Sequence, residues 1–241
     1  MLLKSFGFSD IGLNRPNNED VWAALPEVGF FALADGMGGH QAGEVAAKEA
    51  IDSLLLSAKE IKELNSLELV IEIRYAIERA NQWIYQMSRS SEKLRGMGTT
   101  LCCLKWTPQW IIYAHIGDSR IYRLRNKKLE LLTKDHSLLA KWLAMKEPNK
   151  PCDTPFPYKN IITRALGTSR RVKPEIAVES HEKGDLYILC TDGLHDVLSL
   201  NEMEEKTNQS DTLEAACKNL IEMAKFKRSS DNMTILMIRS E

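Results

Sequence analysis

The sequence predicts an α+β protein: an α/β/β/α sandwich in which two antiparallel sheets are flanked by antiparallel helix pairs. Short apolar runs of strand character open the chain, fill its middle and close it. Between them lie segments whose apolar residues recur at helical spacing, and the first two of these follow each other directly. No Gly/Ser-rich linker and no internal repeat interrupts the 241 residues, so we expect one domain over residues 1–241.

The first half of the chain changes from strand to helix character. Two short apolar runs are separated by Pro26 and Glu27, a turn-like break, and the second run ends abruptly at an Asp-Gly-Met-Gly-Gly segment. Apolar residues then recur every three to four positions, which predicts two helices joined near Asn65. The expected elements are strands at 21–25 and 28–34 and helices at 47–58 and 73–87.

The second half returns to the strand period. Its first four strands follow one another with tight links, which favours a single antiparallel sheet for them. Pro108-Gln109 and Asn126-Lys127 have the composition of hairpin turns. The expected strands are 99–106, 110–116, 120–124, 129–132, 175–179, 185–190 and 233–239, with a helix at 212–225 before the last.

Residues 138–160 differ from the rest of the chain. A short helical piece at 138–145 is followed by four prolines within ten residues, at positions 148, 151, 155 and 157. Proline at that density continues neither a helix nor a central strand. We therefore expect an irregular surface insertion here.

Composition excludes several classes of protein. The net charge is −1, from 32 Lys+Arg and 33 Asp+Glu, so no basic excess indicates nucleic acid or an anionic membrane surface as a partner. No apolar run is long enough for a membrane span or a signal peptide. The five cysteines are odd in number and form no C-x-x-C pair, which is typical of reduced, structural thiols. We expect a cytoplasmic protein.

Acidic residues at the ends of predicted strands are the strongest chemical signal. Asp35, Asp118 and Asp192 each follow an apolar run. A carboxylate at the end of a buried strand is costly unless solvent or a cation compensates it. Acidic ligands without His or Cys companions suit Mg²⁺ or Mn²⁺ rather than zinc. Any single Asp-Gly is more often an ordinary turn, so the whole set carries this interpretation.

Several segments together resemble the PPM (PP2C-type) metal-dependent protein Ser/Thr phosphatases, particularly their compact bacterial members. They occur in the order of that family and span residues 12–232. The segments are Arg15-Pro-Asn-Asn-Glu19-Asp20, Phe31-Ala-Leu-Ala-Asp35-Gly-Met-Gly-Gly-His40 with Gly43-Glu44, Gly96-Met-Gly-Thr-Thr100, Gly117-Asp-Ser-Arg120, Arg164-Ala-Leu-Gly167, Thr191-Asp-Gly193 and Asp231-Asn232.

The resemblance implies two Mn²⁺ or Mg²⁺ ions. By that resemblance Asp35 bridges the ions, Gly36 offers its carbonyl oxygen to one of them, and Asp192 and Asp231 complete the shell of the other. Glu19 and Asp20 match the acidic pair that binds metal or orients its waters.

Three further positions take their expected roles from the same family. Asp118 matches the residue that holds a third ion with Asp192 in bacterial members; the alternative is that it only forms a hairpin turn. Arg15 matches the phosphate clamp, a task that suits a planar guanidinium. Met37 stands where eukaryotic members carry a histidine, and a thioether donates no proton. His40 is then the nearest candidate proton donor, and a metal-bound water is the alternative.

The expected reaction is hydrolysis of phosphoserine and phosphothreonine on proteins by a metal-bridged water, which reverses the action of a Ser/Thr kinase. No Cys-x5-Arg loop is present for cysteine-based phosphatase chemistry. The proline-rich insertion occupies the place of the family's flap. We expect a monomer that binds phosphorylated proteins. Two alternatives remain: a non-catalytic binding module with this fold, and a phosphatase of a small phosphorylated molecule.

Overall fold

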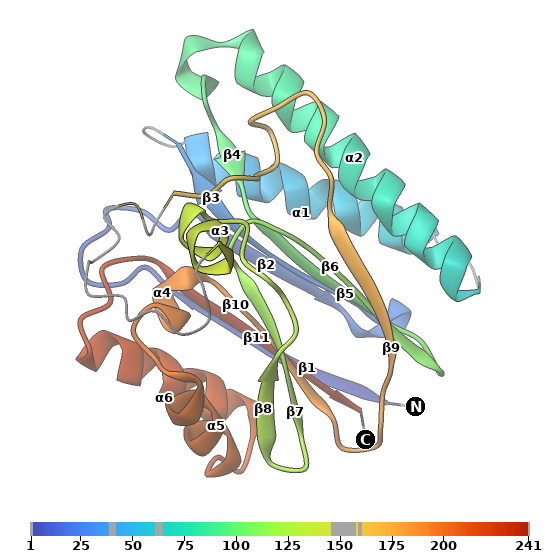
Figure 1. The fold of residues 1–241 in the computed structure, drawn as a ribbon, viewed down its shortest axis with the longest axis vertical. Coiled ribbons are helices and arrows are strands. Elements are labelled where there is room, and N and C mark those ends of the chain that lie inside the picture. Colours follow the sequence, from blue (N-terminus) through green and yellow to red (C-terminus); the bar gives the residue numbers. More distant parts are fainter. Residues whose placement is uncertain (1, 39–41, 61–64, 146–157, 159–160, 241) are drawn as a thin grey trace.

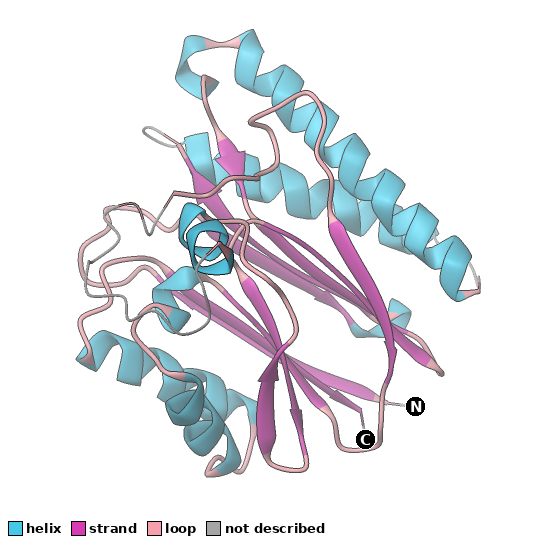
Figure 2. Cartoon of the chain, in the orientation of Figure 1, coloured by secondary structure: helices cyan, strands magenta, loops and turns pink. Residues whose placement is uncertain are grey.

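A computed structural model describes the chain except for residues 1, 39–41, 61–64, 146–157, 159–160 and 241. Two antiparallel sheets lie face to face in the middle, with helices on both outer sides (Figures 1 and 2). This is the predicted sandwich.

The first sheet has five strands, which include the first and the last strand of the chain. Their order is β1 (Leu3–Asp10), β11 (Met233–Ser240), β10 (Leu186–Cys190), β7 (Arg120–Arg125) and β8 (Lys128–Leu131). On its outer face lie α4 (Asp192–His195), α5 (Leu200–Asn208) and α6 (Leu213–Phe226).

The second sheet has six strands. Five are ordered β2 (Asp20–Leu25), β3 (Phe30–Met37), β5 (Leu101–Trp106), β6 (Trp110–Ile116) and β9 (Glu175–Ser180), and β4 (Gly98–Thr99) pairs with β3. Helices α1 (Ala42–Glu60) and α2 (Ser66–Ser90) pack on its outer face. Three shorter helices lie in connections: the 3₁₀ turns η1 (Pro26–Val28) and η2 (Glu92–Leu94), and α3 (Leu138–Ala144).

Strand alternation builds three layers of core from the same strands. In β3, Phe30, Ala32 and Ala34 pack under α1 and α2, whereas Phe31 and Leu33 point into the space between the sheets. This follows from the two-residue period of a strand, and it explains why β3 is apolar on both faces. Because β3 is packed on both faces, the positions of the residues at its ends are well defined.

The predicted elements are largely confirmed, but some boundaries were wrong and several elements were missing. The strand predicted to end at Ala34 runs on through Met37, and Val28 belongs to η1 rather than to the strand. Strand β1 was missed although Phe6 and Phe8 alternate with smaller residues. Helices α4 and α5 were also missed, the latter despite the capping box of Ser199.

The four middle strands do not form one sheet, contrary to the prediction. β5 and β6 belong to the six-stranded sheet, whereas β7 and β8 belong to the five-stranded sheet. The chain crosses between them at Gly117, whose φ of +100° is left-handed backbone that favours glycine. Asp118 therefore lies in a connection between sheets and not in a hairpin. The predicted turn at Asn126 and Lys127 is confirmed, with φ of 50° and 64°.

The four cysteines that the structure describes, Cys102, Cys103, Cys190 and Cys217, are buried free thiols, as predicted. Cys152 lies outside the described residues. None of the described helices has the length and apolar character that crossing a membrane requires. Of the predicted insertion at 138–160, the structure describes α3 and the residues next to it, and the prolines lie outside the described part.

Candidate metal centre

Two aspartates from neighbouring strands face each other directly. Asp20 at the start of β2 and Asp35 near the end of β3 are Cα partners in the antiparallel register. Like charges directly opposite one another destabilise a sheet. Asp20 is 7% exposed, so solvent does little to relieve the repulsion. The residue before it, Glu19, accepts a hydrogen bond on its backbone carbonyl from the N–H of Gly36 at 3.1 Å.

Two further aspartates come from the opposite sheet. Asp192 is the first residue of α4, directly after β10, and Asp231 precedes β11. The two segments are pressed together at Gly193, where a Cβ atom would lie 2.0 Å from the carbonyl oxygen of Asn232. No other residue type fits that approach. Figure 1 shows that α4 lies at the same end of the sandwich as the end of β3.

Asp118 joins this group from the crossing between the sheets. It is 8% exposed, and its charge acts on both Asp35 and Asp192. The structure therefore brings together all five predicted aspartates, from strand ends that are far apart in sequence. Their convergence was the central expectation from the sequence.

The electrostatics of the group are those of buried like charges. Burial raises the pKa of Asp20 to about 7 and that of Asp118 to about 6. The pKa values of Asp35 and Asp192 lie well above the ordinary range, first through burial and then through the neighbouring carboxylates. A divalent cation among the carboxylates would favour their ionised forms and lower these pKa values.

The unused hydrogen-bonding capacity also fits a cation. Oδ1 of Asp20, Asp118 and Asp192 is buried, and within the described residues none of the three has a hydrogen-bond partner. Buried polar atoms are normally satisfied, so three orphaned carboxylate oxygens in one cluster need another partner. All-oxygen ligands of this kind suit Mg²⁺ or Mn²⁺. The residues present thus fit the divalent ions that the sequence predicts.

Arg15 lies at the mouth of the cluster. Its Nη2 donates to Oδ2 of Asp231 at 2.6 Å, and its side chain is 47% exposed. The guanidinium is therefore held beside the carboxylates while it remains open to a ligand from solvent. Glu19 is close enough for its charge to act on Arg15, and burial raises the pKa of Glu19.

Two of the histidines that the structure describes, His181 and His195, are already hydrogen-bonded to backbone carbonyl oxygens. His40 lies outside the described residues. Met37 is in β3 opposite Gly98, and its Cε packs against that glycine. His195 is buried, its Nε2–H donates to the carbonyl oxygen of Asp118 at 3.0 Å, and burial lowers its pKa to about 4. His181 is bonded to the carbonyl oxygen of Thr107.

Sequence reasoning missed the residues that hold the aspartates in place. Thr191 Oγ1 donates to Oδ2 of Asp20 at 2.9 Å and accepts from the N–H of Thr234 at 3.0 Å. Asn232 Nδ2 donates to the carbonyl oxygens of Ile11 and Asn17, and its Oδ1 accepts from the N–H of Glu19. Asn232 thereby anchors both ends of the loop that carries Arg15. Thr191 precedes Asp192 and Asn232 follows Asp231 in the sequence motifs. This adjacency was the sequence signal that could have identified both residues.

Comparison with known proteins agrees with this geometry. Residues 13–232 match the family model described as Protein phosphatase 2C. The chain belongs to this family. It is 35% identical over 237 residues to the serine/threonine phosphatase stp of Listeria monocytogenes, covering 97% of this chain and 94% of the relative. Protein phosphatase PhpP of Streptococcus pneumoniae is 33% identical over 237 residues, covering 95% and 94%.

Solved structures show the same fold. The serine/threonine phosphatase PstP/Ppp of Mycobacterium tuberculosis matches with a TM-score of 0.89 and 32% identity over 100% of both chains. The catalytic domain of PstP in complex with two manganese ions matches with a TM-score of 0.86 and 32% identity, over 99% of this chain and 98% of that one. Members of the family thus bind divalent metal in the fold that is described above.

Proposed function

We propose that this protein is a metal-dependent phosphatase that removes phosphate from serine and threonine residues of proteins. The observation that carries the proposal is the convergence of five aspartates with three orphaned carboxylate oxygens. Membership of the protein phosphatase 2C family and the named Ser/Thr phosphatases among its relatives support it. The whole chain, residues 1–241, would act as one catalytic unit with its flap near 138–160.

We assign the metal ligands as Asp20, Asp35, Asp192 and Asp231, with the carbonyl oxygen of Gly36 added. Asp118 would serve a third ion with Asp192. Divalent ions held there would supply positive charge to the phosphoryl oxygens and lower the pKa of a water molecule. Mn²⁺ and Mg²⁺ both suit the donor set, and the manganese-bound relative favours Mn²⁺.

The other groups of the chain position the substrate and the ligands. Arg15 would bind two phosphate oxygens through its planar fork, exchanging its bond to Asp231 for bonds to the substrate. Thr191 holds the carboxylate of Asp20, and Glu19 would orient water beside it. We retain His40 as the candidate that protonates the leaving alkoxide of serine or threonine.

The experiment is hydrolysis of phosphoserine and phosphothreonine peptides by purified protein with Mn²⁺. Asp35→Asn and Asp192→Asn should each lower kcat by about a thousandfold or more, because each removes a charge at the ions. Asp211→Asn, at an exposed position before α6, is the matched control and should keep wild-type turnover. Chelation of the metal should stop the reaction. Near wild-type turnover in either active-site variant contradicts the proposal, and efficient cleavage of small phosphoesters alone contradicts the protein substrate.

The proposed substrates are the products of a Ser/Thr kinase, and we propose that the enzyme acts as a cytoplasmic monomer. Light scattering of the purified protein tests the oligomeric state directly. A phosphoproteome that is unchanged when Asp35→Asn replaces the wild type in cells would argue against protein substrates.

A further inference from the structure

A hollow of about 370 Å³ lies beside the edge strand β9, and none of the five clustered aspartates lines it. Three cations from separate segments do line it: Arg74 of α2, Lys134 after β8, and Lys173 before β9. None of the three forms an ion pair with any residue that the structure describes. The acid on its wall, Glu175, already forms an ion pair with Arg164 and a hydrogen bond with His136. The hollow therefore carries uncompensated positive charge.

A buried histidine forms part of the same lining. His115 is 3% exposed, and its Nε2–H donates to the carbonyl oxygen of Lys134 at 2.9 Å. Its ring stacks on that of His136, with the centroids 4.7 Å apart and the planes 17° from parallel. The bond from His115 fixes the backbone that carries Lys134. The backbone position of one of the three cations, Lys134, is therefore held by a buried side chain.

Two histidines and a carboxylate could be taken for a metal site, because ligand atoms of His115, His136 and Glu175 lie within 4.8 Å of one another. The hydrogen bonds argue against it. The N–H of Gly117 donates to Nδ1 of His136 at 3.1 Å, so the proton of the neutral ring is on Nε2. Nε2 of His136 lies 3.0 Å from Oε1 of Glu175 and 2.9 Å from Nη1 of Arg164, so neither ring nitrogen is open to a metal and a guanidinium already occupies the cation position beside it. The surplus charge around the hollow indicates an anion instead.

We propose that the hollow binds a phosphoryl group, carried by a phosphorylated side chain or by a free phosphate compound. Arginine and lysine side chains commonly bind phosphate oxygens. The three such side chains that line the hollow have no carboxylate partner among the described residues. Leu132, Pro174 and Ile176 add apolar wall, which gives room for the organic part that bears the phosphate. Proteins usually combine apolar lining with a few placed polar groups in such sites.

The site is connected to the metal cluster by a short chain of contacts. His115 stacks on His136, and His136 accepts the N–H of Gly117, the residue before Asp118. An anion beside His115 favours the protonated ring. Binding should therefore be visible both at the His115 ring and at the amide of Gly117.

The test uses the full chain with its metal removed and the chelator dialysed away. Without metal the carboxylate cluster repels anions and no substrate is hydrolysed, so binding elsewhere is isolated. The probes are inorganic phosphate, a phosphoserine peptide and the same peptide without phosphate. Affinity comes from calorimetry, and NMR follows the pKa of His115 and the amide shift of Gly117. We expect saturable binding of phosphate or phosphopeptide and a raised pKa of His115.

The double variant Lys134→Gln/Lys173→Gln should weaken this binding by about tenfold or more, since two charged contacts are lost. Lys93→Gln/Lys183→Gln removes the same charge at exposed positions elsewhere and should stay within about twofold of wild type. Tighter binding of the phosphopeptide than of phosphate assigns the ligand to a protein, and the reverse assigns it to a free compound. No saturable binding, or equal losses in both double variants, overturns the proposal. Neither result depends on whether the chain hydrolyses phosphoproteins.

Discussion

The two ends of the β-sandwich treat buried acids in opposite ways. At one end, Asp35 near the end of β3 and Asp192 after β10 crowd together, and burial and mutual repulsion raise their pKa values. At the other end, Asp185 precedes β10 and is 1% exposed, yet its pKa is lowered. Burial alone would raise it, but two hydrogen bonds from Arg125, at 2.8 and 2.6 Å, outweigh that cost.

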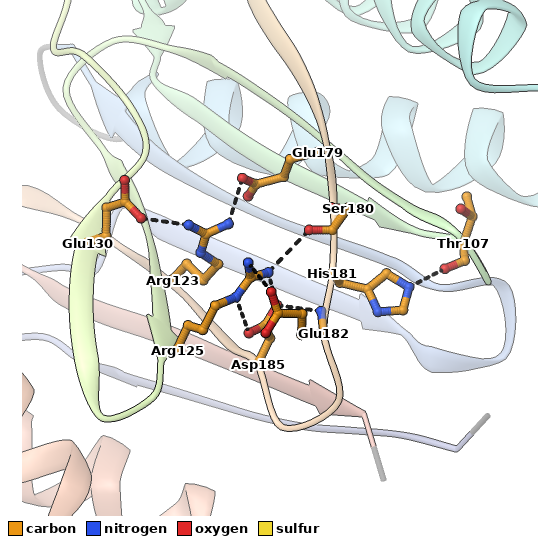
Figure 3. A network of polar contacts seen from close by, with 9 residues as sticks. All are labelled: Thr107, Arg123, Arg125, Glu130, Glu179, Ser180, His181, Glu182 and Asp185. Carbon is orange, nitrogen blue, oxygen red and sulfur yellow. Dashed lines mark hydrogen bonds and ion pairs between the residues drawn. The ribbon is translucent and has the colours of Figure 1, made fainter.

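Figure 3 shows the arginine network at the second end. Arg123 donates to Glu179 of β9 at 2.8 Å and to Glu130 of β8 at 2.6 Å. Arg125 also donates to Glu182 and to the carbonyl oxygen of Ser180. Because Arg123 belongs to one sheet and Glu179 to the other, the network joins the sheets away from the aspartate cluster.

The difference teaches where to look for a ligand. A buried acid such as Asp185, whose two carboxylate oxygens both accept from Arg125, is satisfied by the protein and serves stability. Buried acids that have only each other are satisfied by something from outside, and here the donor set indicates divalent ions.

The largest effect should be the difference in unfolding free energy between variants that remove one carboxylate charge at either end. Asp185→Asn should lower the free energy of unfolding by about 3 kcal/mol, because it leaves the Arg125 pair broken in a buried position. Asp35→Asn, measured without metal, should not lower it, because it relieves repulsion. Urea denaturation of both variants without metal checks the contrast. Equal destabilisation by the two variants would contradict the difference between the two ends.

A dependence on pH should follow at the metal end. The pKa values of Asp20 and Asp118 are about 7 and about 6 in the folded chain, above the ordinary value of 3.8. The folded state therefore binds more protons, and the metal-free protein should lose stability as pH rises from about 4 to about 7. Asp185, with its lowered pKa, acts in the other direction and only below about pH 4. We expect a loss of about 2 kcal/mol between pH 6 and 7.5 without metal, abolished by Mn²⁺. A metal-free stability that is flat or rising over this range would contradict the raised pKa values.

A smaller effect tests the support of the aspartates. Thr191→Val removes the donor to Asp20 Oδ2 and the acceptor for Thr234 N–H while keeping the shape of the side chain. Loss of such a partner should weaken metal affinity by about tenfold. Titration of Mn²⁺ against activity measures it, and unfolding with saturating metal controls for a general loss of structure. An unchanged affinity would mean that Asp20 does not bind the ion.

The smallest effect belongs to the exposed rim of the arginine network. Glu130 is 60% exposed, so its pair with Arg123 lies in solvent on one side. Glu130→Gln should change the free energy of unfolding by about 0.5 kcal/mol or less. A larger loss would show that the network acts as a unit rather than through Asp185 and Glu179 alone.

The amino-acid sequence by itself determined the elements and the chemistry. Period-two and helical patterns identified most strands and helices, and the aspartates in their motifs indicated hard metal ions. Local signals are enough for these conclusions because periodicity and ligand type are properties of short segments.

Only the tertiary structure decided how the segments meet. It separated β6 from β7 at Gly117, which makes Asp118 a bridge between the sheets and not a hairpin residue. It placed Asp20 opposite Asp35, gave Thr191 and Asn232 their supporting roles, and collected Arg74, Lys134 and Lys173 around one hollow. These contacts join residues far apart in sequence, and they depend on sheet order and register, which no single segment encodes.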